Sequence, residues 1–223
     1  GQGDDAARAG VAVGGAPTGP YRFIRSGRVN PGAVPSDMDE DALAVLDTLD
    51  MEHYKEWWTD SWTDAVHKGL FVKRDQEGGQ MSRDMTLYVD DDGKAYHIYS
   101  SEENLTIHIA ELSDDYLSHT GKYVRMSPAG HNEAPAIFKR NGTYWMITSG
   151  CTGWAPNEAR MHSAPSILGP WTQHPNPCVG PKAELTFGGQ STYILKVQGK
   201  EDAFLFMGDI WRPEHPSDAR YIW

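Results

Sequence analysis

Residues 131–154 read HNEAPAIFKRNGTYWMITSGCTGW, and this stretch indicates how the rest of the chain is built. Glu133 stands at the head of an apolar run, Asn141-Gly142 follows it, and a second run leads into a cluster of small polar residues. An Asn-Gly pair between two alternating runs is a strong β-hairpin signal. The stretch therefore predicts two antiparallel strands, the first opened by a carboxylate.

Two further stretches repeat this layout. Asp84 precedes M-T-L-Y-V and a D-G turn, and Gln190 precedes S-T-Y-I-L-K-V and a Q-G turn. Each turn leads into a second alternating run that ends in polar residues. Polar residues thus open a strand at intervals of roughly fifty residues, which indicates a repeated structural unit.

The repeat predicts an all-β fold of the β-propeller type. The units cover roughly 82–125, 131–173 and 186–223, each with three or four short strands and turns at close spacing. Four-stranded repeats of about 40–50 residues are typical of propeller blades. A β-sandwich would also give alternating strands. It would not place three similar polar residues at the start of successive units.

Residues 36–70 interrupt the β pattern. Ser36 or Asp37 can cap a helix, and leucines follow at helical spacing. Two short acidic helices, inserted between repeats, fit this segment. The segment contains three tryptophans, Trp57, Trp58 and Trp62. These either cover a site or join the insertion to the rest of the protein, and we expect at least two of them to join it.

Composition excludes several classes of protein. The 223 residues carry a net charge of −11, from 31 acidic and 20 basic side chains. No basic stripe is present to neutralise phosphates, which argues against nucleic acid as a partner. No run of 18 apolar residues occurs, so no membrane span is expected. Cys151 and Cys178 are too few for a disulfide framework or a zinc cage, and whether they pair is left open.

The heads of the units are the candidate catalytic residues. In a propeller the first strand of each blade lines the central channel, so Asp84, Glu133 and Gln190 would converge. Two carboxylates facing one cleft are what glycoside hydrolysis uses, and their mutual repulsion keeps one protonated near neutral pH. Alternatively, a strand-start Asp or Gln can simply cap a turn. Glu133 enters an apolar strand, where an unpaired carboxylate would be costly.

Polar and aromatic residues after the second strands suit a sugar ligand. Sugar rings stack on indoles, and hydroxyl groups need polar partners. The candidates are Glu103, Asn104, Thr152 and Trp154. No histidine shows zinc-site spacing, and Asp90–Asp92 is interpreted as a solvated hairpin turn. No metal or cofactor is expected, with a structural calcium left open.

These motifs resemble glycoside hydrolase family 43. The match is carried by residues 83–96 (RDMTLYVDDDGKAY), 133–150 (EAPAIFKRNGTYWMITSG) and 166–171 (SILGPW). SGCTGWAPNEAR at 149–160 and TFGGQSTY at 186–193 resemble the branch that includes exo-β-1,3-galactanases. The resemblance covers residues 8–35 and 75–223 and implies a five-bladed β-propeller.

The resemblance also implies roles for single residues. Glu133 resembles the general acid, and Asp84 resembles the carboxylate that tunes the pKa of that acid and orients the sugar. Gln190 resembles a glutamine that positions water where other members use an aspartate base. The residues that resemble holders of the terminal sugar are Glu103, Asn104 and Thr152.

The chain departs from the family in extent. Residues 10–24 resemble 160–173, so the chain is expected to begin near the end of a repeat unit. Five blades need roughly 250–300 residues. We therefore interpret 1–223 as one N-terminally incomplete propeller domain, with about three blades, part of another, and the helical insertion at 36–70. The missing blades are expected from the rest of the protein.

The expected activity is that of an inverting exo-glycosidase that releases galactose from β-1,3-galactan. The alternatives are an α-L-arabinofuranosidase or β-xylosidase of the same family, or a carbohydrate-binding propeller without turnover. An acyl-transfer hydrolase is disfavoured because no G-x-S-x-G motif occurs. The expected partner is an oligo- or polysaccharide, and a polymer substrate implies an extracellular or periplasmic location.

Overall fold

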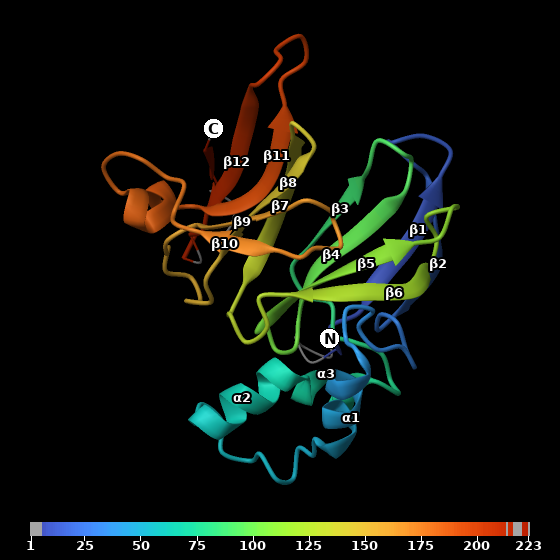
Figure 1. The fold of residues 1–223 in the computed structure, drawn as a ribbon. Helices are drawn as coiled ribbons and strands as arrows, with labels where there is room; N and C mark the ends of the chain where they lie inside the picture. The colour runs from blue at the N-terminus through green and yellow to red at the C-terminus, as the bar shows by residue number, and fades with distance from the viewer. Residues whose placement is uncertain (1–5, 213, 216–219, 223) are drawn as a thin grey trace.

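The computed structural model describes residues 6–212, 214–215 and 220–222, the last three by their backbone only. Thirteen strands form four separate antiparallel sheets (Figure 1). The first sheet contains β1 (Ala9–Gly14) and β2 (Tyr21–Gly27). The second contains β3 (Met85–Val89), β4 (Ala95–Ser101), β5 (Thr106–Leu112) and β6 (His119–Met126). The third contains β7 (Glu133–Arg140), β8 (Thr143–Ser149), β9 (Arg160–Ala164) and β10 (Thr172–His174). The fourth contains β11 (Gln190–Lys196), β12 (Phe204–Ile210) and β13 (Arg220–Ile222).

Each sheet is an up-and-down meander, because every strand pairs with its neighbours along the chain. Arg140 pairs with Thr143 across the β7–β8 turn, and Asn141 and Gly142 have φ values of 52° and 77°. Positive φ at both central residues is what a type I′ hairpin turn requires, and Asn-Gly adopts it readily. The predicted hairpin is confirmed.

The three large sheets follow the predicted units at 82–125, 131–173 and 186–223. β1 and β2 form a further hairpin, as the similarity between 10–24 and 160–173 indicates. The all-β class with antiparallel sheets is thus confirmed. The described residues form part of a fold and do not close into a ring of sheets.

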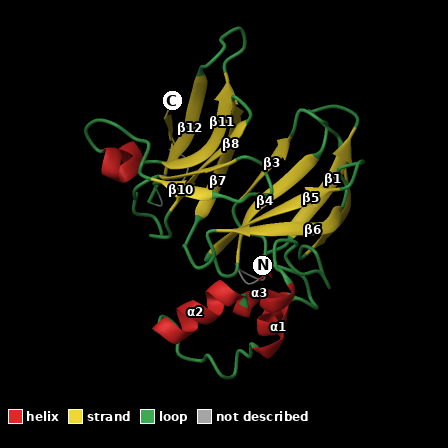
Figure 2. Ribbon diagram, in the orientation of Figure 1, coloured by secondary structure: helices red, strands yellow, loops and turns green. Residues whose placement is uncertain are grey.

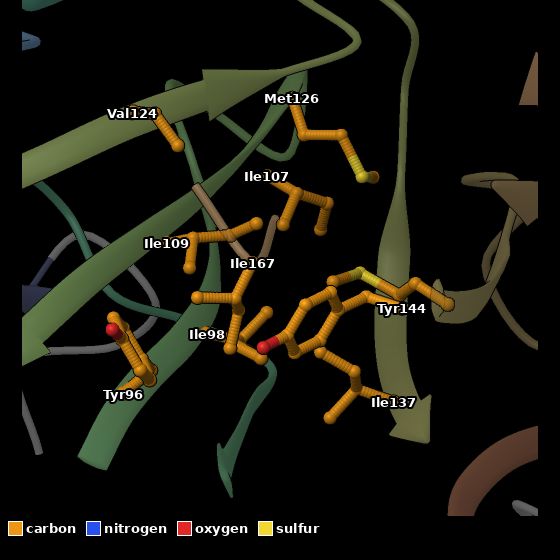
Figure 3. Packing of buried hydrophobic residues seen from close by; sticks show 10 residues of the cluster. Tyr96, Ile98, Ile107, Ile109, Val124, Met126, Ile137, Tyr144 and Ile167 are labelled. Carbon is orange, nitrogen blue, oxygen red and sulfur yellow. The ribbon is translucent and has the colours of Figure 1, made fainter. Parts of the chain in front are cut away.

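The main core lies between the sheet β3–β6 and the sheet β7–β10. Figure 3 shows Ile137 and Tyr144 from the second sheet facing Ile98, Ile107 and Ile109 of the first. These three isoleucines are fully buried. Each contributes about 1.5–3 kcal/mol relative to an exposed position. This apolar layer fixes how the two sheets, and the strand starts that they carry, lie relative to each other.

Three helices lie together at one end of the sheets (Figure 2). They are α1 (Glu40–Thr48), α2 (Asp60–Lys68) and α3 (Leu70–Asp75). Asp39 caps α1, with its Oδ1 accepting from the amide of Ala42 at 2.9 Å, instead of Ser36 or Asp37. The third helix was not predicted. It continues α2 directly after Gly69, whose left-handed φ of 106° ends the preceding helix.

A second core fixes these helices to the sheets. Trp62 and Phe71 are buried there against Leu105, the residue before β5. Trp62 therefore joins the insertion to the body, as expected for at least two of the three tryptophans. Trp58, by contrast, is 63% exposed.

A buried ionic network adds to this attachment. Arg125 on β6 donates from Nε and Nη2 to Glu102, both at 2.7 Å, and to the carbonyls of Val66 and His67 at the end of α2. Glu102 is fully buried and also accepts from His108 at 2.7 Å. Burial alone would raise the pKa of Glu102, but Arg125 and His108 outweigh it and lower the pKa to about 2. One guanidinium thus neutralises a buried carboxylate and caps a helix.

We expect Arg125→Met to destabilise the protein strongly. Removing one partner leaves the charge of Glu102 buried without compensation, a change that costs about 3–5 kcal/mol. Urea unfolding at pH 7 measures the loss. Because the folded pKa of Glu102 lies near 2, below its ordinary 4.5, the wild type should lose stability as pH falls through that window.

The matched control is Arg140→Ala, which removes an exposed ion pair with Asp202. Exposed pairs contribute little, so its unfolding midpoint should stay close to that of the wild type. Equal midpoints for both variants would contradict the role of Arg125.

Candidate functional site

A cavity of about 680 Å³ lies where the starts of three strands meet. Asp84 precedes β3, Glu133 begins β7 and Gln190 begins β11, and all three line it. The repeat pattern predicts that these strand-start residues converge, and the structure places them around one cavity. The other lining residues are Ala6, Ala7, Arg8, Ser82, Arg83, Asn104, Gly153, Trp154 and Trp211.

The start of β7 is irregular, and this irregularity presents Glu133. The pairing of β7 with β8 shifts between Glu133 and Ala136, and Ala134 has a left-handed φ of 52°. Non-glycine residues adopt that conformation at a cost and are found most often at functional sites. The amide of Ala134 donates to Oδ2 of Asp84 at 3.2 Å. Asp84 is thereby held beside Glu133 on a neighbouring sheet.

The surroundings of Glu133 favour its protonated form. Its side chain is half-buried, and Oε1 accepts from Nδ2 of Asn104 at 2.7 Å. Burial raises the pKa of Glu133, and the charge of Asp84 raises it further, against the opposing effect of Asn104. Burial and Glu133 also raise the pKa of the Cys151 thiol to about 12. The site can therefore offer a proton from a carboxylic acid beside a second carboxylate.

Gln190 is held at both ends of its amide. Nε2 donates to Oγ of Ser149 at 2.8 Å, and Oε1 accepts from Nε1 of Trp211 at 2.9 Å. Trp211 contacts Trp154, with ring centroids 5.3 Å apart. Trp154 is 62% exposed, so the two indoles form an open aromatic wall of the cavity. Such a wall offers apolar faces to a sugar ring beside a fixed amide.

The loop after β4 presents Asn104. Glu102, Glu103 and Asn104 all have left-handed backbones, with φ values of 51°, 60° and 63°. The carbonyl of Asn104 accepts from the amide of Asn132 at 3.0 Å, which ties this loop to the residue before Glu133. Asn104, a predicted sugar ligand, thus lies in the cavity and contacts the predicted acid.

The side chains of two other predicted sugar ligands form hydrogen bonds with other groups of the protein. The carboxylate of Glu103 accepts from Arg74 at 2.9 Å and from Arg83 at 2.5 Å, and Glu103 does not line the cavity. The hydroxyl of Thr152 donates to the carbonyl of Ala155 at 2.6 Å and accepts from Asn157 at 2.7 Å. Their roles as sugar ligands stay predictions.

Sequence reasoning missed several residues of the cavity. Arg83 is part of the R-D-M-T-L motif, and Trp211 follows the second strand of its unit just as Trp154 does, so both carried a usable signal. Asp209 does not line the cavity but pairs with Gln190 across β11 and β12, and its Oδ1 is buried without a hydrogen-bond partner. Burial and Asp84 raise its pKa. Arg8 carried no signal in the sequence.

Cys151 and Cys178 are free thiols in the structure, which answers the question of their pairing. Across the described part of the chain, no cluster of three or more His, Cys, Asp or Glu side chains is arranged to hold a metal ion. No helix among the described residues has both the length and the apolar character needed to cross a membrane.

Comparisons with known proteins identify a matching family and similar chains. The model of the family "Glycosyl hydrolases family 43" matches residues 55–209. A curated β-D-galactofuranosidase from Aspergillus niger is 30% identical, over 52% of this chain and 37% of its own. A solved family 43 β-1,3-galactosidase with galactodeoxynojirimycin is 66% identical with a TM-score of 0.96, over 100% of this chain and 64% of its own. The exo-β-1,3-galactanase of Clostridium thermocellum is 32% identical with a TM-score of 0.73, and the match covers 100% of this chain and 40% of the galactanase. The chain spans less than two thirds of each of these relatives.

The arrangement predicts the direction in which two substitutions move the pKa of Glu133. Asp84→Asn removes a nearby negative charge and should lower it. Asn104→Ala removes a hydrogen bond to the carboxylate and should raise it. Carboxyl ¹³C NMR titration of Glu133 measures both shifts. Two shifts of the same sign, or none, would contradict the described electrostatics.

Proposed function

The chain belongs to glycosyl hydrolases family 43, and on that premise we propose that it carries the active site of an inverting exo-glycosidase releasing galactose from β-1,3-galactan. The observation that carries the proposal is the pair of Glu133 and Asp84 in one cavity, with the pKa of Glu133 raised by burial and by Asp84. A protonated acid beside a carboxylate is the requirement of glycoside hydrolysis. The 66% identity to a β-1,3-galactosidase supports galactose as the sugar released.

In the proposed reaction, Glu133 donates its proton to the glycosidic oxygen as the bond from that oxygen to the anomeric carbon breaks. Water adds to the anomeric carbon from the opposite face, which inverts its configuration. Gln190, fixed by Ser149 and Trp211, holds this water through its amide. The proton that the water loses passes to solvent, and solvent returns one to Glu133. The mechanism assigns no step to a metal or cofactor.

The terminal galactose would occupy the described cavity. Trp154 and Trp211 provide apolar surface for the ring, and Asn104 provides a polar partner for hydroxyl groups. Glu103 and Thr152 are proposed to complete the set, either directly or by orienting Arg83 and the loop at Asn157. Specificity for galactose would then follow from which hydroxyls these groups can reach.

We assign the rest of a five-bladed propeller to further residues of the intact protein. Met85, Leu87 and Val89 leave one face of β3 apolar and exposed, and Tyr193 and Leu195 do the same on β11. Contiguous apolar strand faces mark surfaces that other elements cover. The share of each relative that the chain spans supports the same assignment. A polymer substrate places the protein outside the cytoplasm, at the cell exterior or in the periplasm.

Other activities within the family remain as alternatives. The Aspergillus niger relative is named for β-D-galactofuranosides, so a furanoside-cleaving enzyme, such as an α-L-arabinofuranosidase, is one. A β-xylosidase is another. The exposed indole pair of Trp154 and Trp211 would also suit a propeller that binds carbohydrate without turnover.

We expect Glu133→Gln to reduce kcat on β-1,3-galactan by about 10²- to 10⁴-fold, because general acid catalysis contributes that much. Binding of galactose should be largely retained. The assay incubates the intact protein with β-1,3-galactan and follows released sugar by NMR, where galactose should appear first as the α-anomer. Glu111→Gln, on β5 in an ion pair with Lys94, is the control and should leave turnover unchanged. Full activity of Glu133→Gln would refute the assignment. No galactose from β-1,3-galactan, with arabinose or xylose released from arabinose- or xylose-containing substrates, would replace galactose as the proposed product.

A separate prediction concerns Gln190. Gln190→Ala should lower kcat by about 10²-fold with little change in KM, since it removes the group that positions the water. Thr192→Ala is the matched control, because Thr192 lies on the same strand as Gln190 and its hydroxyl bonds to the carbonyl of Met207 on β12. Equal activity of the two variants would make Gln190 a structural residue.

A further inference from the structure

Trp58 is an exposed aromatic residue in an unfavourable backbone conformation. It lies just before α2, is 63% exposed and has a φ of 70°. A bulky side chain adopts the left-handed region only with strain, and such strain clusters at active sites and ligand-binding sites.

Neighbouring rings hold the indole of Trp58 in place. Its centroid lies 5.0 Å from that of buried Trp62 and 5.1 Å from that of His131, with the His131 ring inclined by only 25°. Trp62 is fixed in the core of the insertion. Trp58 is therefore a rigid aromatic surface that its contacts orient but do not cover.

His131 places this surface beside the proposed acid. It precedes Glu133 by two residues, so their Cα atoms are at most about 7 Å apart. The amide of His131 donates to the carbonyl of Leu105 at 3.1 Å, and Nη1 of Arg160 donates to the carbonyl of His131 at 2.6 Å. These bonds fix the backbone of residue 131, and the next residue, Asn132, bonds the carbonyl of Asn104, whose side chain lines the cavity with Glu133.

We propose that Trp58, backed by His131, forms a stacking platform for the sugar units on the leaving-group side of the cleaved bond. This inference rests on the proposed function. The general acid protonates the glycosidic oxygen, so the departing part of the chain lies beyond Glu133. The exposed indole of Trp58 stacks on His131, which precedes that acid by two residues. Trp154 and Trp211 line the cavity itself and serve the terminal sugar.

The platform lies on the helical insertion, so the insertion would contribute directly to substrate length preference. Each further galactose unit that reaches Trp58 adds apolar contact, whereas a substrate without a leaving-group sugar does not touch it. Loss of the indole should therefore selectively weaken the binding of longer substrates and leave the chemical step unchanged.

The test compares two substrates of the intact protein: β-1,3-galactotetraose and β-galactosyl fluoride, which has no leaving-group sugar. Trp58→Ala should lower kcat/KM on the tetraose about tenfold through KM, since truncating an aromatic anchor typically costs over 1 kcal/mol. Its activity on the fluoride should stay within about twofold of the wild type. Trp58→Phe, which keeps a ring on His131, should recover most of the loss.

Trp57→Ala is the matched control. Trp57 lies next in the chain and contacts Trp62, Phe71 and the edge of Trp58, but no ring contact joins it to His131 in the described structure. It should affect both substrates alike or neither. Equal losses on both substrates for Trp58→Ala, or no loss on either, would overturn the platform and leave Trp58 a packing residue.

A binding measurement separates this inference from the proposed function. Calorimetry on Glu133→Gln compares galactotetraose with galactose, with and without Trp58→Ala. Loss of affinity for the tetraose alone supports the platform, and unchanged affinity overturns it. Absence of galactose release by the wild type from either substrate would instead overturn the proposed function.

Discussion

The buried pair of Arg125 and Glu102 is the interaction on which the site depends. It joins the sheet β3–β6 to the end of α2, and it anchors the first of three successive left-handed residues. The next, Glu103, bonds Arg74 and Arg83, and the third, Asn104, bonds Glu133. The network, the insertion and the cavity are thus connected through one short loop.

The acidity of the site follows from where the strands begin. Glu133 sits at an irregular strand start, half-buried and next to Asp84 from another sheet, so its ionised form is disfavoured. A regular β7 pairing through its first residues would leave no free Ala134 amide to bind Asp84. The backbone cost at Ala134 and the electrostatic cost at Glu133 therefore belong to the same local distortion.

Local chemistry made much of the fold predictable. The Asn141-Gly142 turn and the alternating runs identify the strands, and the repeated polar heads indicate which residues meet in the cavity. Contacts between distant segments were not predictable. The ion pairs of Glu103 with Arg74 and Arg83, and the place of Arg8 in the cavity, depend on packing that no local pattern encodes.

The meander topology has a consequence for how the molecule matures. Every strand pairing within a sheet joins neighbours in the chain, so each sheet can form early from contacts of low sequence separation. The cavity, in contrast, is built only where three sheets and the N-terminal residues Ala6–Arg8 come together. Partly assembled chains can thus contain well-formed sheets and still lack a working site. The cavity that the proposed activity requires would be completed last, after the nascent chain has finished folding.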